Sequence, residues 1–124
     1  MTNQIFLYFG SGLTLIWGVA HLFPTKSVVH GFGDISLDNK RIITMEWIIE
    51  GIFLIFIGLL CAGLTLLDRS NSLSNYVFIL SSVFLFVLAI ISLFTGFRVN
   101  FLPYKLCPFI FSLSAILIII GVLY

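Results

Sequence analysis

The chain has 124 residues, of which 60% are hydrophobic and 9% are charged, and its formal net charge is +1. Soluble domains carry about 25% charged residues, so a soluble chain of this size could not hide so much apolar surface from water. The composition predicts an integral membrane protein. The near-neutral charge, without a basic cluster, excludes the field that would attract nucleic acid, which we do not expect as a partner.

Four apolar runs predict four transmembrane helices within one domain, residues 1–124. The runs cover residues 5–23, 42–67, 76–97 and 106–124. Each is long enough to cross the hydrocarbon layer as a helix, and none shows the alternation of a barrel strand. Short connections favour antiparallel neighbours. The predicted fold class is therefore an all-α, up-down bundle of four transmembrane helices.

The distribution of basic residues predicts the orientation in the membrane. Loops 24–41 and 98–105, with their flanks, carry five basic residues, and the opposite side carries only Arg69. The five are Lys26, Lys40, Arg41, Arg98 and Lys105. By the positive-inside rule we expect both loops in the cytoplasm and both termini outside, in a bacterial inner (plasma) membrane.

The first apolar run carries a stripe of small and polar residues on one helical face. At about 100° per residue, the face is shared by Ser11, Thr14, Gly18 and His21, with Trp17 at its edge. Such stripes mark helix–helix contacts in lipid, because they allow close approach and hydrogen bonds between helices. In the following loop, Ser36 or Asp38 is expected to cap the second long helix.

The second run begins with two carboxylates one helical turn apart, Glu46 and Glu50. The uncharged stretch 51–67 is shorter than the roughly 20 residues a span needs, so the hydrocarbon layer should reach back to about Ile48. Glu50 then lies just inside this layer, where an ionisable group is costly and usually faces protein or trapped water. The stripe that they begin continues through Leu54, Ile57, Cys61 and Thr65.

The third and fourth runs carry weaker stripes. In the third, one face is shared by Ser81, Leu85, Leu88, Ser92 and Thr95, with Gly96 alongside. In the fourth, two faces compete, one with Cys107, Ser114 and Gly121 and the other with Pro108, Ser112 and Ala115. All these stripes are also explained as plain packing seams, but a seam does not need a carboxylate.

Polar side chains from all four helices are expected at the cytoplasmic end of the bundle. Glu50 and His21 are the candidate catalytic residues, with Glu50 moving a proton and His21 tuning it. The candidate ligand-binding residues are Glu46, Trp47, Arg98, Trp17 and Asn100. The structural alternatives are a pair of Glu50 with Arg98 or His21, and a pair of Glu46 with Lys40 or Arg41.

A metal centre is a weaker reading of the same end. His21, His30, Glu46 and Glu50 are suitable ligand types, but their spacing matches no metal motif, so we predict none. The sequence identifies no cofactor. Cys61 and Cys107 should lie at different depths, too far apart for a disulfide.

The sequence is compatible with three functions. The first is a protein that binds or transforms a lipid-like or quinone-like molecule, and whether it is an enzyme stays undecided. The second is an accessory or structural subunit of a larger membrane complex, packed against membrane lipid and against other proteins or a second copy. The third, proton or ion conduction, needs polar residues across the whole span, and the outer half offers only hydroxyls. The four-span layout resembles the small bacterial membrane proteins of the DoxX-like group, and we transfer no residue role from it.

Overall fold

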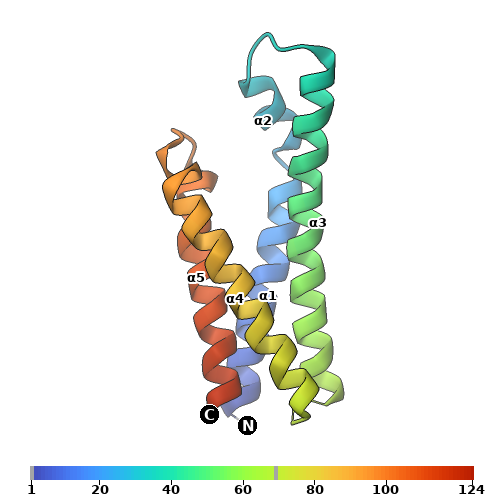
Figure 1. The fold of residues 1–124 in the computed structure, drawn as a ribbon, viewed down its shortest axis with the longest axis vertical. Helices are drawn as coiled ribbons and strands as arrows, with labels where there is room; N and C mark the ends of the chain where they lie inside the picture. Colours follow the sequence, from blue (N-terminus) through green and yellow to red (C-terminus); the bar gives the residue numbers. More distant parts are fainter. Residues whose placement is uncertain (1, 69) are drawn as a thin grey trace.

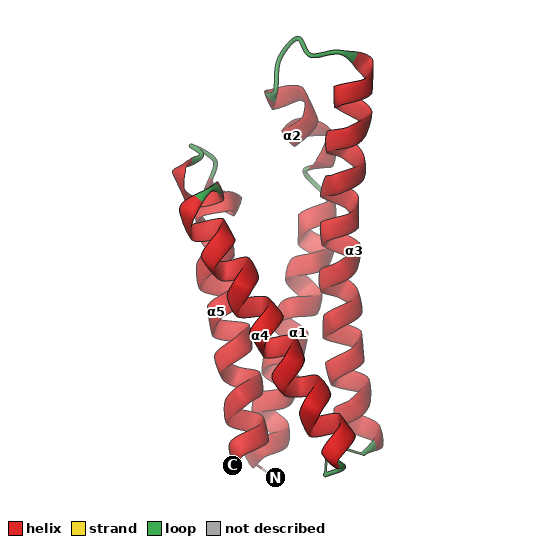
Figure 2. Cartoon of the chain, in the orientation of Figure 1, coloured by secondary structure: helices red, strands yellow, loops and turns green. Residues whose placement is uncertain are grey.

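The computed structural model describes residues 2–68 and 70–124, and within this part the chain is helical (Figure 2). The elements are α1 (Thr2–Leu22), α2 (Thr25–Gly31), α3 (Leu37–Leu67), α4 (Ser72–Phe94), the short 3₁₀ helix η1 (Gly96–Arg98) and α5 (Leu102–Leu123). Among the described residues, four helices are long and apolar enough to span a membrane, which confirms the number of candidate spans. Arg69, the one basic residue expected on the outer side, lies outside the described residues.

The helices extend beyond the apolar runs because polar residues cap them. α3 begins at Leu37, ahead of the predicted 42, and the Ser36 side chain accepts a hydrogen bond from the Asn39 N–H at 3.2 Å. This confirms Ser36 as the cap. α4 begins at Ser72, ahead of the predicted 76, because the Asn71 side chain accepts from the Leu73 N–H at 3.0 Å. Capping side chains, and not the limits of the apolar run, therefore decide where these two helices begin.

The connection 24–41 contains a helix that the sequence reasoning missed. α2 follows α1 after a two-residue turn and packs beside α3 (Figure 1). The Thr25 hydroxyl donates to the Leu22 carbonyl at 2.6 Å, and the Val28 side chain is buried. One buried valine among polar neighbours gives too weak a periodicity to predict a helix from sequence.

The long helices pack in the lateral order α3, α1, α5, α4. α1 lies against both α3 and α5, and α5 lies against both α1 and α4. α4 crosses the others obliquely, so that it is near α3 at the connecting turn and moves away toward the opposite end (Figure 1). The short turn therefore does not make α3 and α4 close neighbours over their length, contrary to the expectation from connection length.

Glycines allow α1 to approach the backbones of α3 and α5 closely. A Cβ atom on Gly58 of α3 would lie 2.7 Å from the Leu15 backbone nitrogen of α1, and one on Gly18 of α1 would lie 3.0 Å from the Gly51 carbonyl oxygen. Gly10 makes the same kind of contact with the Ser114 carbonyl of α5, at 3.0 Å. α4 has no glycine, and its buried face toward the bundle carries the small residues Ser81, Ser82 and Ala89 in their place.

The buried faces agree with most of the predicted stripes of α1 and α3, except at the start of the α3 stripe, where Glu46 is exposed and Glu50 is half-buried. Ser11, Thr14 and His21 of α1 are buried, as are Leu54, Ile57, Cys61 and Thr65 of α3. α5 buries both of its competing faces because it lies between α1 and α4. The prediction for the third span is wrong at its end: Ser81 and Leu85 are buried, but Thr95 is exposed, since α4 has diverged from α3 there.

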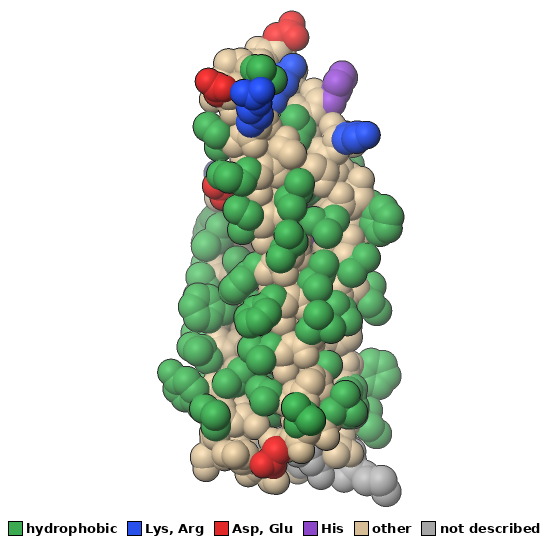
Figure 3. All heavy atoms as spheres, turned by 90° about the vertical axis from the view of Figure 1, so that its right-hand side faces the viewer, with side chains coloured by type: hydrophobic (Ala, Val, Ile, Leu, Met, Phe, Trp, Pro, Cys, Tyr) green, Lys and Arg blue, Asp and Glu red, His purple; other side chains and the backbone are tan. Residues whose placement is uncertain are grey.

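The sequence predicts that buried hydroxyls form hydrogen bonds between helices, but most of them bond within their own helix. The Ser11 hydroxyl donates to the Leu7 carbonyl at 2.6 Å, and Thr14, Thr65 and Ser82 likewise donate to the carbonyl four residues earlier. These bonds satisfy the hydroxyls within their own helices. Apolar side chains cover the outer surface, and charged side chains lie toward its two ends (Figure 3).

The glycine contacts give a first prediction. Gly58→Ala should lower the stability of the bundle by about 1–3 kcal/mol, because the new methyl group meets the α1 backbone and forces the helices apart. Gly63→Ala is the matched control on the same helix, since a Cβ there meets nothing within 4 Å. Thermal unfolding in mild detergent measures both. Equal melting temperatures for the two variants would contradict the role assigned to Gly58.

Candidate functional site

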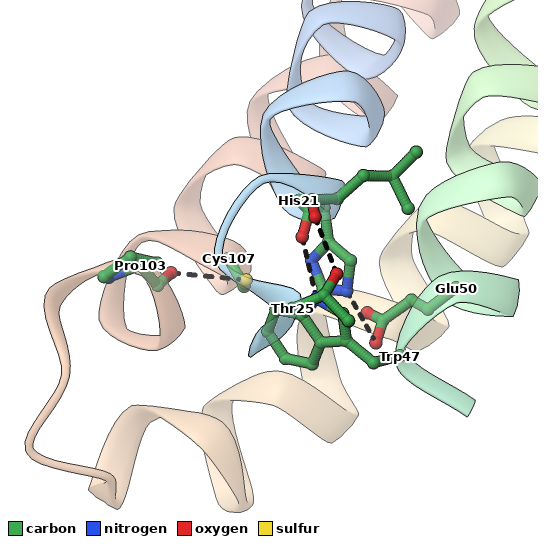
Figure 4. A network of polar contacts seen from close by, with 7 residues as sticks. His21, Thr25, Trp47, Glu50, Pro103 and Cys107 are labelled. Carbon is green, nitrogen blue, oxygen red and sulfur yellow. Dashed lines mark hydrogen bonds and ion pairs between the residues drawn. The ribbon is translucent and has the colours of Figure 1, made fainter. Parts of the chain in front are cut away.

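The C-terminal end of α1 and the first half of α3 bring three side chains together. His21, Trp47 and Glu50 point toward one another (Figure 4). The His21 and Trp47 rings are stacked, with centroids 3.9 Å apart and an interplanar angle of 16°. The Trp47 Nε1–H donates to the His21 carbonyl oxygen at 2.8 Å. Because the last carbonyls of a helix have no partner within it, this bond satisfies the end of α1 and ties it to α3.

Glu50 lies next to the buried imidazole. Its Oε2 is 3.5 Å from His21 Nε2, which is within ion-pair range, while the side chain of His21 is 5% exposed and that of Glu50 is 39% exposed. The geometry is too loose for a hydrogen bond, and among the described residues His21 Nε2 has no hydrogen-bond partner. In this pair the Glu50 carboxylate is therefore partly accessible from outside, and, within the part of the chain that the structure describes, the buried His21 Nε2 lacks a hydrogen-bond partner.

Two cavities meet at Glu50. The lateral cavity, about 480 Å³, lies between α3 and the other helices, and its wall includes Glu46, Trp47, Glu50, Leu88 and Tyr104. The inner cavity, about 140 Å³, is bounded by His21, Glu50, Ser92, Thr95 and Cys107 as well as by Tyr104. The lateral cavity exists because α4 diverges from α3 at this end.

Two further cavities adjoin the same end. The end cavity, about 700 Å³, lies between α2 and the connection from α4 to α5, and Asn100 is part of its wall. The Trp17 cavity, about 120 Å³, is enclosed by Trp17, His21, Trp47 and residues of α5. Among the described residues, the Trp17 Nε1–H has no hydrogen-bond partner.

Tyr104 borders all four of these cavities and was not predicted as a site residue. Its ring packs edge-on against Trp47, with centroids 5.5 Å apart, and against Phe101, at 5.7 Å. In the sequence it reads as one of several tyrosines at span ends, the usual sign of an aromatic belt. No local signal separates it from the others, because its position depends on how α5 faces α3.

The predicted site residues are partly brought together. His21, Trp47 and Glu50 form one cluster, Glu46 is exposed on the wall of the lateral cavity, and Trp17 and Asn100 lie in the two adjoining cavities. Arg98 is exposed at the end of η1 and lines none of the four cavities. Of the two partners considered for Glu50, His21 is therefore the one that lies beside it, and among the described residues Arg98 forms no ion pair with it.

The structure does not form the ion pair of Glu46 with Lys40 or Arg41 that the sequence analysis considered. Arg41 contacts Asp38, with Nη1 and Oδ1 3.6 Å apart, instead of Glu46. Within the described residues Glu46 has no ion-pair partner. The two carboxylates of the site thus share one helix face without a Lys or Arg against either of them.

A metal centre is not formed by the residues considered for it. His30 is exposed on α2, and in the described part of the chain no group of three or more His, Cys, Asp or Glu residues is placed to hold a metal ion. Cys61 and Cys107 are both buried and free.

No protein-family model, curated protein or solved structure matches this chain. The resemblance of the four-span layout to the DoxX-like group thus gains no support from a family match.

The Trp47 bond generates a second prediction. Trp47→Phe removes the donor to the His21 carbonyl and should lower the free energy of unfolding by about 1–3 kcal/mol, since that buried acceptor loses its partner. Trp17→Phe is the matched control, because the Trp17 Nε1–H has no partner to lose. Chemical or thermal unfolding in detergent compares the two. A Trp17→Phe variant that is destabilised as much would contradict the assignment.

Proposed function

We propose that this chain is an integral membrane protein that binds, or transforms, a lipid-like or quinone-like molecule at the end of the bundle that holds His21 and Glu50. The observation that carries the proposal is the lateral cavity: about 480 Å³, with walls that are apolar and aromatic apart from Glu46 and Glu50. A cavity of this size with few, converging polar groups is typical of small-molecule sites. The tail would lie along α3 and the head group would meet Glu50.

Exposed apolar side chains on the cavity wall support entry from the membrane. Ile42, Ile49 and Phe53 of α3 are each between 42% and 52% exposed and line the lateral cavity. In a bilayer these side chains face hydrocarbon, so an amphiphile can reach Glu50 sideways without leaving the lipid. If a reaction takes place, Glu50 moves the proton, and His21 tunes it from 3.5 Å away.

The arrangement in the membrane is part of the proposal. We place the chain in a bacterial inner membrane as an antiparallel, up-down bundle, with both termini outside and the loops 24–41 and 98–105 in the cytoplasm. The support is the excess of basic residues in these two loops. The cavity would then open at the level of the cytoplasmic leaflet.

Reporter fusions test this orientation. Alkaline phosphatase fused after Tyr124 should be active in cells, because that enzyme works only outside the inner membrane, whereas green fluorescent protein there should be dark. The same reporters inserted after Asn100 should give the opposite result. Activity of both phosphatase fusions, or of neither, would contradict the proposed topology.

Ligand binding is tested by filling the lateral cavity. Leu88→Trp puts a larger side chain on its α4 wall, and Val87→Trp is the control, because Val87 is 44% exposed and lines none of the four cavities. Native mass spectrometry from mild detergent should show a bound small molecule on the wild type and on Val87→Trp, and a loss of at least about tenfold in occupancy on Leu88→Trp.

Glu50→Gln completes this test. The variant should stay folded and lose the small molecule, because the amide replaces the charged acceptor without changing the shape of the side chain. Wild-type protein without any bound small molecule, or equal occupancy in all variants, would contradict the proposed function.

An accessory subunit of a larger membrane complex is the second candidate, and the divergence of α4 from α3 favours it. The lateral face left between these helices could hold a helix of another protein or of a second copy. In that case native mass spectrometry would recover the chain with a stoichiometric partner, and Glu50→Gln would weaken the assembly instead of removing a small molecule.

Proton or ion conduction ranks below both. Leu54, Phe78, Leu85 and Phe111 are at most 1% exposed and fill the middle of the bundle. The nearby hydroxyls of Ser82 and Thr65 are engaged with their own helices. A polar path across the membrane therefore has no support.

A further inference from the structure

The charges around the lateral cavity are unbalanced. Glu46 and Glu50 both line it, and of the residues that the structure describes, no Lys or Arg lines it or any of the three adjoining cavities. The two carboxylates are four residues apart on one helix, where like charges are neighbours and repel each other. The side chains in the wall therefore favour an occupant that brings positive charge.

The imidazole adds a second acceptor in the adjoining inner cavity, which His21 lines and which shares Glu50 and Tyr104 with the lateral cavity. His21 is 7% exposed, and its Nε2 faces Glu50 at 3.5 Å without a hydrogen bond. Buried polar atoms normally have a partner, so an unused nitrogen beside a cavity indicates a missing donor. With its proton on Nδ1, neutral histidine accepts a hydrogen bond at Nε2. Carboxylate and imidazole then both accept from one head group.

Aromatic rings surround the same position. Trp47 and Tyr104 line the lateral cavity, and their rings pack edge-on, 5.5 Å apart. Phe32 and Phe53 are also part of its wall. Aromatic faces attract organic cations, and tryptophan does so most strongly. The rings therefore favour the same sign of charge as the carboxylates.

We propose that the head group bound at Glu50 is a primary ammonium, carried on an apolar tail. Its three N–H donors match the acceptors of Glu50 and His21, and its charge offsets the pair of carboxylates. This inference rests on the proposed function, which it narrows to amine-headed amphiphiles. The ammonium can belong to a free long-chain amine or to an aminophospholipid, because the chemistry recognised is the same.

The same contacts disfavour other occupants. A quinone carries only acceptors, so it would place carbonyl oxygens against carboxylate oxygens and against an acceptor nitrogen. An anionic head would meet two carboxylates without a basic residue in the wall. A divalent metal ion would lack ligands, since the described residues hold no cluster of three.

Tail-matched ligands test the head group directly. Native mass spectrometry of the full chain in a mild non-ionic detergent, titrated with dodecylamine or 1-dodecanol, should show one saturable site with an affinity at least about tenfold higher for the amine. Glu50→Gln should reduce the affinity for the amine by about 10- to 100-fold and leave that for the alcohol nearly unchanged, because only the charge-assisted hydrogen bond is lost. Asp34→Asn, which removes an exposed carboxylate outside the cavities, is the control and should change neither.

A second pair of ligands identifies the source of the ammonium. In nanodiscs, a Glu50-dependent preference for phosphatidylethanolamine over phosphatidylcholine with the same acyl chains assigns the site to a lipid head group. Binding of dodecylamine without that preference assigns it to a free amine. If Glu50→Gln does not fold, Glu46→Gln replaces it, with an expected loss of about 2- to 5-fold for the amine.

The outcomes separate this inference from the proposed function. Equal binding of amine and alcohol, or a preference that survives Glu50→Gln, overturns the ammonium inference and leaves the amphiphile site in place. Absence of binding by every amphiphile overturns both.

Discussion

The close contact between α1 and α3 is the constraint on which the site depends. Gly18 and Gly51 lie where the two backbones approach each other, and a Cβ atom on Gly18 would lie 2.7 Å from the Ile55 backbone nitrogen, so that a side chain there would force the helices apart. His21 follows Gly18 by less than one turn, and Glu50 directly precedes Gly51. The contact therefore sets the register that brings Nε2 and Oε2 to 3.5 Å. A shift of α1 by one turn would move the imidazole about 5 Å away from the carboxylate.

The position of α4 opens the cavity beside this pair. α4 has no glycine, packs on α5, and leaves α3 at the end where the polar residues lie. The extensive α1–α3 contact and the small α3–α4 contact together place the carboxylate–imidazole pair next to an open cavity. Tyr104 borders each of the four cavities.

The electrostatics of the site differ from those inferred from residue types alone. From their positions in the sequence, Arg98 and Glu50 are expected at the same end of the bundle, where they could form an ion pair. The 3₁₀ turn that ends α4 leaves Arg98 exposed and away from the cavities, while Arg41 contacts Asp38. The groups that lie near Glu50 are the His21 imidazole and the aromatic rings of Trp47 and Tyr104. Among the residues that the structure describes, no Lys or Arg lines the cavity beside Glu46 and Glu50, and the proposed preference for a cationic head group rests on this observation.

The sequence by itself determined the number of candidate spans, the buried stripe of α1, that of α3 from Leu54 onward, and the placement of His21, Trp47 and Glu50 at the same end of the bundle. These are properties of single helices, and hydropathy and the 3.6-residue period report them directly. Only the tertiary structure decided that Tyr104 joins the site, that Arg98 does not, and that α4 departs from α3. Which helices lie beside one another depends on where their backbones can approach and on how the connections fold. The connection 24–41, for example, forms α2 around the buried Val28. Neither the approach of backbones nor the folding of a connection leaves a periodic signal in the chain.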